Sequence, residues 1–363
     1  MPNKTYLRKP GKTMQALVLL EPHRFEIQKV PIPHPGPDEV LCRVMATSIC
    51  GTDPKVIDGK IPGWPPSYPF IAGHEWSGQI VELGEAVTGW KLGDRVVGEP
   101  HKGCGNCRQC LTGNYNMCDN YGQPDTGHRH YGFKSQGSYA DYMVVAARAL
   151  HHLPDSISYV EGTMVGSAGV ALHGLRLAGV EPASTGLVIG PGAIGLCAIQ
   201  LLKAMGATRV ICVGRKGARL EMAQSVGADD LVDSLEGKAI EQVLELTEGR
   251  GVDISVESAG AEQGPTYAIK MTRFGGKVVL LAFFVPPDRT VPMQDVGYKQ
   301  LTLYGVKADP NTYTQVLSFV QAGKLALKPL ISHVYPLRDF AKALDTFVNR
   351  REGAMKVVIE AES

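Results

Sequence analysis

The sequence has no excess of charge of either sign. Its 363 residues include 37 Lys and Arg against 36 Asp and Glu, which leaves a formal net charge of +1. This balance gives no electrostatic reason to expect a nucleic-acid partner or an anionic membrane surface. Hydrophobic residues make up 44% of the chain, which excludes low-complexity disorder and a small disulfide scaffold. The length exceeds what one ordinary core supports, so two domains are expected.

A continuous membrane-spanning segment is also missing. The residues between Glu181 and Lys203 carry no charge and are numerous enough to cross a bilayer. They include Pro182, Pro191 and four glycines, however, and so favour a strand, a turn and a helix. The N-terminal sequence MPNKTYLRKPGKT is basic and lacks the apolar core of a signal peptide. We expect a cytoplasmic protein with no membrane partner, in which clustered cysteines bind metal rather than form disulfides.

Two patterns of apolar residues divide the chain. Up to residue 161, short apolar runs separated by Gly and Pro indicate a β-rich domain. From 162 to 300, buried strand-like runs alternate with helix-length segments, which is typical of a doubly wound parallel sheet. The sequence after residue 300 predicts a further strand over 301–306, an amphipathic helix over 311–322 and a closing strand near 356–359. The predicted fold class is therefore α/β.

A glycine-rich motif opens the second region. The sequence LVIGPGAIG over 187–195 contains GxGxxG between a predicted strand and a predicted helix. The first glycine permits a tight turn, the second lets the backbone approach a pyrophosphate, and the third lets helix and strand pack closely. The helix N-terminus offers free amide donors to phosphate. This context predicts a dinucleotide site that includes Gly190, Gly192, Ala193, Ile194 and Gly195.

The next predicted strand bears on the choice of dinucleotide. An NAD site usually has an acidic residue about 20 residues beyond the motif, on the ribose 2′-hydroxyl. Here the strand ends in Gly214, Arg215 and Lys216, with Arg219 one turn further on. A glycine makes room and an arginine can bind a 2′-phosphate, so NADP is predicted over NAD; a solvated basic turn is the alternative.

Two later loops follow predicted strands of the same sheet. They are Ser258-Ala259-Gly260 and Leu281-Ala282-Phe283, and ligands bind open sheets outside the carboxyl ends of strands. Ala259, Leu281 and Phe283 are therefore predicted to contribute to the cofactor cleft, with ordinary loop packing as the alternative.

Four cysteines lie close together in a loop rich in glycine and asparagine. They are separated by two, two and seven residues, and they are Cys104, Cys107, Cys110 and Cys118. Four thiolates suit a tetrahedral zinc ion and leave no position for a substrate, so this zinc is predicted to be structural. Disulfides and an iron–sulfur cluster are the alternatives; the Cys-Pro signature of bacterial ferredoxins is absent.

Other candidate metal ligands are dispersed. Cys50 lies in SICGTD, and His74 and Glu75 lie in GHEWSG. Their spacing alone does not connect them, because single Cys and His residues more often belong to a core.

Taken together, CGTD, GHEWSG, GDRV at 93–96, the four-cysteine loop and GPGAIG resemble the zinc-dependent medium-chain dehydrogenase/reductase superfamily. The resemblance covers essentially the whole chain and is greatest to the sorbitol (polyol) and threonine dehydrogenase branch. It implies a GroES-like catalytic domain over 1–161 with a structural zinc lobe at about 101–120. A Rossmann domain over 162–300 and a return segment over 301–363 would follow. It also implies two zinc ions per chain, and a homodimer or homotetramer joined at the sheet edge near 301–306.

The resemblance assigns roles to individual residues. Cys50 and His74 become ligands of a catalytic zinc, Asp53 orients His74, and Thr52 relays a proton. Where relatives often have an outer histidine of the relay, this chain has Lys55. Where many relatives have a zinc-associated Glu or Cys, this chain has Gly166. Glu75 is therefore the predicted third ligand, beside a water molecule; a buried acid close to the metal is the alternative.

The predicted function is reversible oxidation of a secondary alcohol of a polyol or sugar, with hydride transfer to NADP. A threonine or simple-alcohol dehydrogenase using NAD, a non-catalytic NADP-binding relative and a zinc-free quinone or enoyl reductase are the alternatives. The cluster His128, Arg129, His130 and Tyr131 either lines the substrate site or forms a solvated loop.

Overall fold

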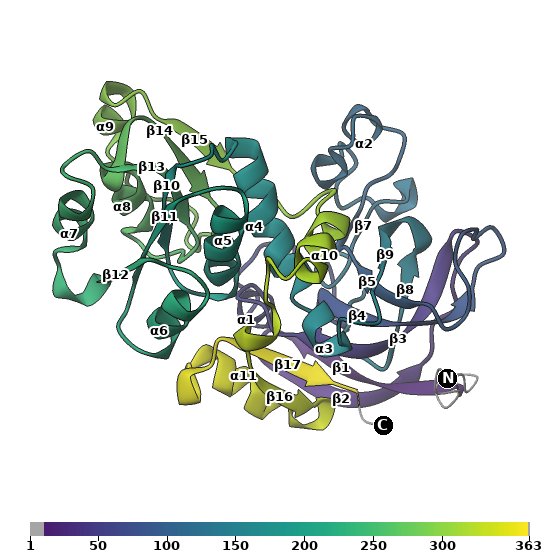
Figure 1. The fold of residues 1–363 in the computed structure, drawn as a ribbon. Helices are drawn as coiled ribbons and strands as arrows, with labels where there is room; N and C mark the ends of the chain where they lie inside the picture. The colour runs from purple at the N-terminus through teal and green to yellow at the C-terminus, as the bar shows by residue number, and fades with distance from the viewer. Residues whose placement is uncertain (1–10, 362–363) are drawn as a thin grey trace. The chain divides into compact units, whose positions relative to one another are not determined.

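The computed structural model describes residues 11–361 and divides the chain into two compact units (Figure 1). One unit comprises the residues up to Gly166 together with those from Ile331 onward, and the other comprises Ser167–Leu330. The N-terminal segment MPNKTYLRKPGKT, in which we expect no signal peptide, lies mostly outside the described residues.

The first unit is built mainly from antiparallel strands. Its strands are β1 (Thr13–Glu21), β2 (Arg24–Pro31), β3 (Glu39–Ser48), β4 (Glu75–Leu83), β5 (Arg95–Gly98), β6 (His101–Lys102), β7 (Arg129–His130), β8 (Tyr142–Ala146), β9 (Leu150–His152), β16 (Ile331–Pro336) and β17 (Lys356–Glu360). Its helices are α1 (Asp53–Ile57), α2 (Arg108–Leu111), α3 (Tyr159–Gly162) and α11 (Phe340–Val348). The main sheet has the order β16-β17-β3-β4-β5-β9, with β8 also paired to β3.

Strand β1 shows why this unit holds together. Its side chains point alternately to the two faces of the strand, as in any β-strand. Leu17 and Leu19 pack into one hydrophobic cluster, whereas Ala16 and Val18 pack into another. The strand is therefore buried on both faces, and it is correspondingly apolar.

The second unit contains a six-stranded parallel sheet. Its strands are β10 (Thr185–Ile189), β11 (Arg209–Gly214), β12 (Asp230–Asp233), β13 (Val252–Glu257), β14 (Thr272–Leu280) and β15 (Thr302–Gly305). Its helices are α4 (Val165–Ala178), α5 (Ala193–Ala204), α6 (Ala218–Ser225), α7 (Ala239–Leu246), α8 (Gly264–Met271), α9 (Met293–Tyr298) and α10 (Tyr313–Gln321), of which α4 begins at the end of the first unit. The strand order β12-β11-β10-β13-β14-β15 reverses direction between β10 and β13. Such a reversal marks the place where open α/β sheets bind ligands, outside the carboxyl ends of the strands.

The predicted β-rich domain and doubly wound sheet are both confirmed, but the return to the first unit comes later than residue 301. Strand β15 pairs in parallel with β14, and Leu301 and Leu303 pack against the same hydrophobic cluster as Val278. Burial of these side chains keeps the segment with the parallel sheet, so the second unit extends to Leu330.

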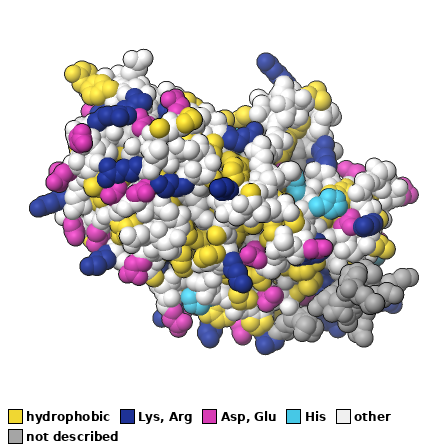
Figure 2. Space-filling model, viewed as in Figure 1, with side chains coloured by type: hydrophobic (Ala, Val, Ile, Leu, Met, Phe, Trp, Pro, Cys, Tyr) yellow, Lys and Arg dark blue, Asp and Glu magenta, His cyan; other side chains and the backbone are white. Residues whose placement is uncertain are grey.

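The surface has mixed charge. Lysine and arginine side chains are interspersed with acidic ones over the face that Figure 2 draws, as expected for a net charge of +1. Within residues 11–361, no helix has both the length and the hydropathy needed to span a membrane.

Candidate functional site

Three predicted metal ligands come together in the first unit. Cys50 lies just after β3, His74 lies directly before β4, and Glu75 is the first residue of β4. The two strands are antiparallel neighbours, with Ser48 opposite Glu75. This register brings the ligand atoms of Cys50, His74 and Glu75 to within 4.8 Å of one another. A thiolate, an imidazole and a carboxylate are a ligand set that suits zinc.

Asp53 organises two of these ligands. Its carboxylate is fully buried and accepts the backbone N–H of Cys50 at 2.7 Å and the hydroxyl of Tyr139 at 2.6 Å, both on Oδ2. The other oxygen, Oδ1, lies 3.3 Å from Nδ1 of His74. Burial alone lowers the pKa of His74, but the negative charges of Asp53 and Cys50 raise it well above its usual value. The contact at Nδ1 leaves Nε2 as the nitrogen that can face a metal.

Glu75 has a partner that the sequence motifs did not indicate. Its Oε2 forms an ion pair with Nζ of Lys356, whose residue is only 2% exposed, and accepts the Ser48 hydroxyl at 2.9 Å. Burial lowers the pKa of Lys356, but the charge of Glu75 raises it overall. A carboxylate has two oxygens, so this pairing leaves room for ligation through the other one. The available signal was a lysine directly before the apolar run of the closing strand, Val357–Ile359.

The residues predicted to relay a proton lie beside these ligands in the chain. Thr52 is the N-cap of α1, and its buried Oγ1 has no hydrogen-bond partner in the described part of the chain. Lys55 lies on α1 itself and is half-buried. Gly166 lies in the first turn of α4, where it has no side chain to offer a metal.

Aromatic and imidazole rings extend outward from His74. The Phe133 ring lies 4.4 Å from the His74 ring and 4.3 Å from the His130 ring, measured between centroids. His130 in turn stacks on His101 at 3.9 Å, because β6 and β7 pair these two residues. His128, His130 and Tyr131 are all buried, so the solvated-loop interpretation is wrong for these three; Arg129 is half-buried.

The four clustered cysteines have the geometry of a metal site. Sγ of Cys104 lies 3.9 Å from Sγ of Cys110, and Sγ of Cys107 lies 3.8 Å from Sγ of Cys118. A tetrahedron with zinc–sulfur bonds of about 2.3 Å has edges of about 3.8 Å, so the thiolates fit zinc. None of the cysteines within the described residues forms a disulfide. Burial alone raises the pKa of Cys104, but amide donors that include the side chain of Asn120 lower it to about 6.

The glycine motif lies where β10 passes into α5, as predicted. A Cβ on Gly190 would lie 2.6 Å from Cβ of Ala259, and one on Gly195 would lie 2.1 Å from the Gly190 carbonyl oxygen. A Cβ on Gly192 would meet no other described atom within 4 Å, so that side of the turn is open to a ligand. Gly192 is also the N-cap of α5 and supplies no capping side chain, so the first-turn amides of Ala193, Ile194 and Gly195 can bind phosphate.

The predicted basic residues lie at the carboxyl edge of the same sheet. Arg215 and Lys216 are exposed and follow β11, which pairs with β10 in parallel. Neither side chain has a hydrogen bond or an ion pair among residues 11–361. The backbone N–H of Lys216 is held by Asp233 at 3.2 Å. Arg219 lies on α6 and is half-buried.

The loops after β13 and β14 complete this edge. Ala259 and Phe283 are exposed there, whereas Leu281 is buried and donates its backbone N–H to the Glu257 carbonyl. The Ser258 hydroxyl donates to the carbonyls of Ile189 at 3.0 Å and Gly190 at 2.9 Å. The sequence predicted that these loops lie at the cofactor cleft. It did not indicate that the Ser258 hydroxyl bonds to the carbonyls of the glycine turn.

Comparisons with known proteins identify the family of this chain. Family models match residues 36–155 (Alcohol dehydrogenase GroES-like domain) and residues 193–322 (Zinc-binding dehydrogenase). The chain is 30% identical to sorbitol dehydrogenase of Bacillus subtilis (strain 168) over 96% of this chain and 97% of that relative. It is 34% identical to L-threonine 3-dehydrogenase of Pyrococcus horikoshii over 96% of this chain and 99% of that one.

Solved structures agree as well. The solved structure of a zinc-binding dehydrogenase from Sinorhizobium meliloti 1021, bound to NADP, matches this chain with a TM-score of 0.88 and 30% identity. The match covers 96% of this chain and all of that one. The chain therefore belongs to the zinc-dependent medium-chain dehydrogenase/reductase superfamily, in its sorbitol and threonine dehydrogenase-like branch, and is a zinc-dependent alcohol dehydrogenase that uses NAD or NADP.

Proposed function

We propose that this enzyme reversibly oxidises a secondary alcohol of a polyol or sugar-type substrate and that NADP is its preferred cofactor. The observation that carries the proposal is the convergence of Cys50, His74 and Glu75. Thr52, close to Cys50 in the chain, adds a buried hydroxyl that has no hydrogen-bond partner among the described residues. A binding protein without catalytic function has no need of this set. The buried histidines beyond Phe133 add polar groups suited to a substrate with several hydroxyls.

In this proposal Cys50, His74 and Glu75 would hold a catalytic zinc. The zinc would supply Lewis acidity toward an alcohol oxygen, and the bound nicotinamide would supply the hydride acceptor. Asp53 keeps the His74 ring in one orientation through Nδ1. Lys356 and Ser48 hold the Glu75 carboxylate in place through its Oε2. Thr52 accepts the substrate proton and passes it outward. The four cysteines of the lobe hold a second, structural zinc.

Metal content tests the proposed zinc sites. We expect two zinc ions per chain by elemental analysis of the purified enzyme. Cys50→Ser should remove one ion and the activity. Cys104→Ser should remove the other ion and lower the melting temperature. A chain that holds one ion at most would favour the zinc-free reductases or a non-catalytic relative.

The substrate proposal is tested by an assay panel that follows the absorbance of reduced nicotinamide. Polyols, sugars, threonine and simple alcohols would each be tried with NAD and with NADP, before and after chelation of zinc. Chelator-sensitive oxidation of a vicinal diol supports the proposal. Chelator-sensitive oxidation of threonine with NAD would favour the second candidate, which the 34% identity to a threonine dehydrogenase suggests. Full activity after zinc removal would overturn the mechanism.

The cofactor preference rests on Arg215, which is exposed and without a described partner at the carboxyl edge of the sheet. Arg215→Ala should weaken NADP binding by about 1.5–3 kcal/mol, the range for hydrogen bonds to charged groups, and leave NAD binding nearly unchanged. Titration of each dinucleotide by calorimetry measures both. Equal losses for the two cofactors would contradict the assignment.

We also propose that the enzyme is a homodimer or homotetramer. Strand β15 is the edge of the parallel sheet, and an edge strand with apolar residues such as Leu303 needs to be covered. Light scattering at micromolar concentration should give a multiple of 39.0 kDa. A monomeric mass would contradict this.

A further inference from the structure

Gly214, at the end of β11, is confined by the glycine turn. Its φ lies outside the left-handed region, so the backbone itself does not demand glycine. A Cβ at this position would lie 2.5 Å from Cδ and 2.6 Å from Cγ of Pro191. Such separations are far inside van der Waals contact, so any side chain at 214 meets the proline ring.

Pro191 cannot move aside as a flexible side chain would. Its ring closes on its own backbone nitrogen and locks φ. The residue is buried, and the turn that carries it is tied to β11 by the Gly190 N–H, which donates to the Val213 carbonyl at 2.9 Å. On the other side, the Ser258 hydroxyl holds the Gly190 carbonyl. The proline is therefore pinned against the position that Gly214 occupies.

This contact bears on cofactor choice. In NAD sites an acidic side chain near the end of this strand binds the ribose 2′-hydroxyl. We propose that Pro191 limits what position 214 can hold: its ring excludes an acidic side chain there, so that Pro191 and Gly214 together reserve the end of β11 for the 2′-phosphate of NADP. This inference rests on the proposed NADP preference, and it adds that residues 191 and 214 act as a matched pair.

The test uses four forms of the holoenzyme: wild type, Pro191→Ala, Gly214→Asp and the double variant. Gly214→Asp alone should lose NADP affinity at least about tenfold without gaining NAD affinity, because the new carboxylate is displaced by the proline ring. Pro191→Ala alone should keep NADP affinity within about threefold. In the double variant the carboxylate fits, and NAD affinity should rise about tenfold above that of Gly214→Asp.

Dinucleotide binding would be measured directly by calorimetry, and melting temperatures would be recorded without cofactor. The clash should lower the melting temperature of Gly214→Asp by about 5 °C, and Pro191→Ala should restore most of it in the double variant. If Gly214→Asp alone binds NAD as tightly as the double variant and melts like wild type, the inference is overturned. Failure of the NADP proposal is recognised separately, by equal effects of Arg215→Ala on both dinucleotides.

Discussion

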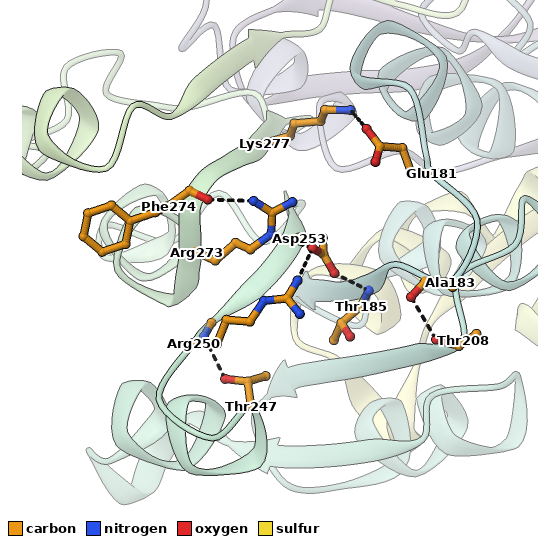
Figure 3. A network of polar contacts seen from close by, with 11 residues as sticks. Glu181, Ala183, Thr185, Thr208, Thr247, Arg250, Asp253, Arg273, Phe274 and Lys277 are labelled. Atoms are coloured by element: carbon orange, nitrogen blue, oxygen red, sulfur yellow. Dashed lines mark hydrogen bonds and ion pairs between the residues drawn. The ribbon is translucent and has the colours of Figure 1, made fainter.

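Strand β13 carries a carboxylate at each end, and the two lie in opposite electrostatic surroundings. At the amino end, Asp253 accepts donors from Arg250 and Arg273 on one oxygen and the Thr185 N–H on the other, as Figure 3 shows. At the carboxyl end, Glu257 is fully buried, and within residues 11–361 its carboxylate accepts only the backbone N–H groups of Ala259 and Gly260. Its Oε2 has no hydrogen-bond partner within the described residues.

The pKa values of the two carboxyls differ accordingly. Burial raises the pKa of each, but at Asp253 the Thr185 N–H and the two arginines outweigh burial and lower it below its usual value. At Glu257 the two backbone donors do not outweigh burial, and the pKa rises to about 7. The amino end of β13 thus stabilises the ionised carboxylate of Asp253, whereas the carboxyl end disfavours the ionised form of Glu257.

The same contrast holds for the cations at the two edges of the sheet. At the amino edge, Arg250 and Arg273 are paired with Asp253, and Lys277 is paired with Glu181 (Figure 3). They line a small polar cavity of about 200 Å³. At the carboxyl edge, Arg215 and Lys216 have no described side-chain partner. The amino edge uses its charges for stability, whereas the carboxyl edge leaves them available to a ligand.

The largest effect is expected from Asp253→Ala. It removes the carboxylate that accepts from Arg250, from Nε of Arg273 and from the Thr185 N–H, which should cost about 3 kcal/mol of unfolding free energy. Asp253→Asn is the matched control, because it keeps an acceptor but no charge and should cost less. Thermal unfolding and cofactor titration would be compared. If Asp253→Ala also weakens NADP binding, the amino edge contributes to the cofactor site, and the proposed difference in role between the two edges is wrong.

Glu257→Gln should act through pH. Because folding raises the pKa of Glu257 from 4.5 to about 7, the native state holds the proton more tightly. Wild-type stability therefore falls as pH rises through the interval from 4.5 to 7 and stays low above it. The variant should be about 1–2 kcal/mol more stable than wild type at pH 8 and no more stable at pH 5. Equal differences at both pH values would contradict the assignment.

Ser258→Ala should affect both stability and cofactor. Loss of its two hydrogen bonds to the glycine turn should cost about 1 kcal/mol and weaken NAD and NADP alike by about threefold. Ser255→Ala is the control: this hydroxyl contacts Thr272 at 2.6 Å in the middle of the strand. Ser255→Ala should lower stability and leave cofactor affinity unchanged. If it weakens cofactor binding as much as Ser258→Ala does, Ser258 has no specific part in the cofactor site.

The smallest effect is expected from Lys277→Ala. Its partner Glu181 has a side chain that is 75% exposed, and exposed ion pairs contribute about 0.5 kcal/mol. The loss should shrink further when unfolding is measured at high salt, because salt screens exposed charges. A loss as large as that of Asp253→Ala would show that the amino edge depends on both pairs equally.

The sequence alone determined the features that are local in the chain. The glycine turn follows from residues that adjoin one another between a strand and a helix, and β10 and α5 lie where that pattern predicts. The four cysteines likewise lie within one short loop, so their convergence needs little help from the rest of the chain. Apolar periodicity predicted most strands for the same reason, since it is a property of neighbouring residues.

The tertiary structure decided what depends on register and on distant packing. Cys50 meets His74 and Glu75 because β3 pairs with β4, and Lys356 reaches Glu75 from 281 residues further along the chain. The burial of His130 and the place of β15 in the parallel sheet likewise depend on neighbours that are remote in sequence. Residue spacing cannot encode such contacts, because they form only when whole strands pair and cores close. The three candidate metal ligands are therefore brought together by the fold, whereas the glycine turn is formed by residues that adjoin one another in the chain.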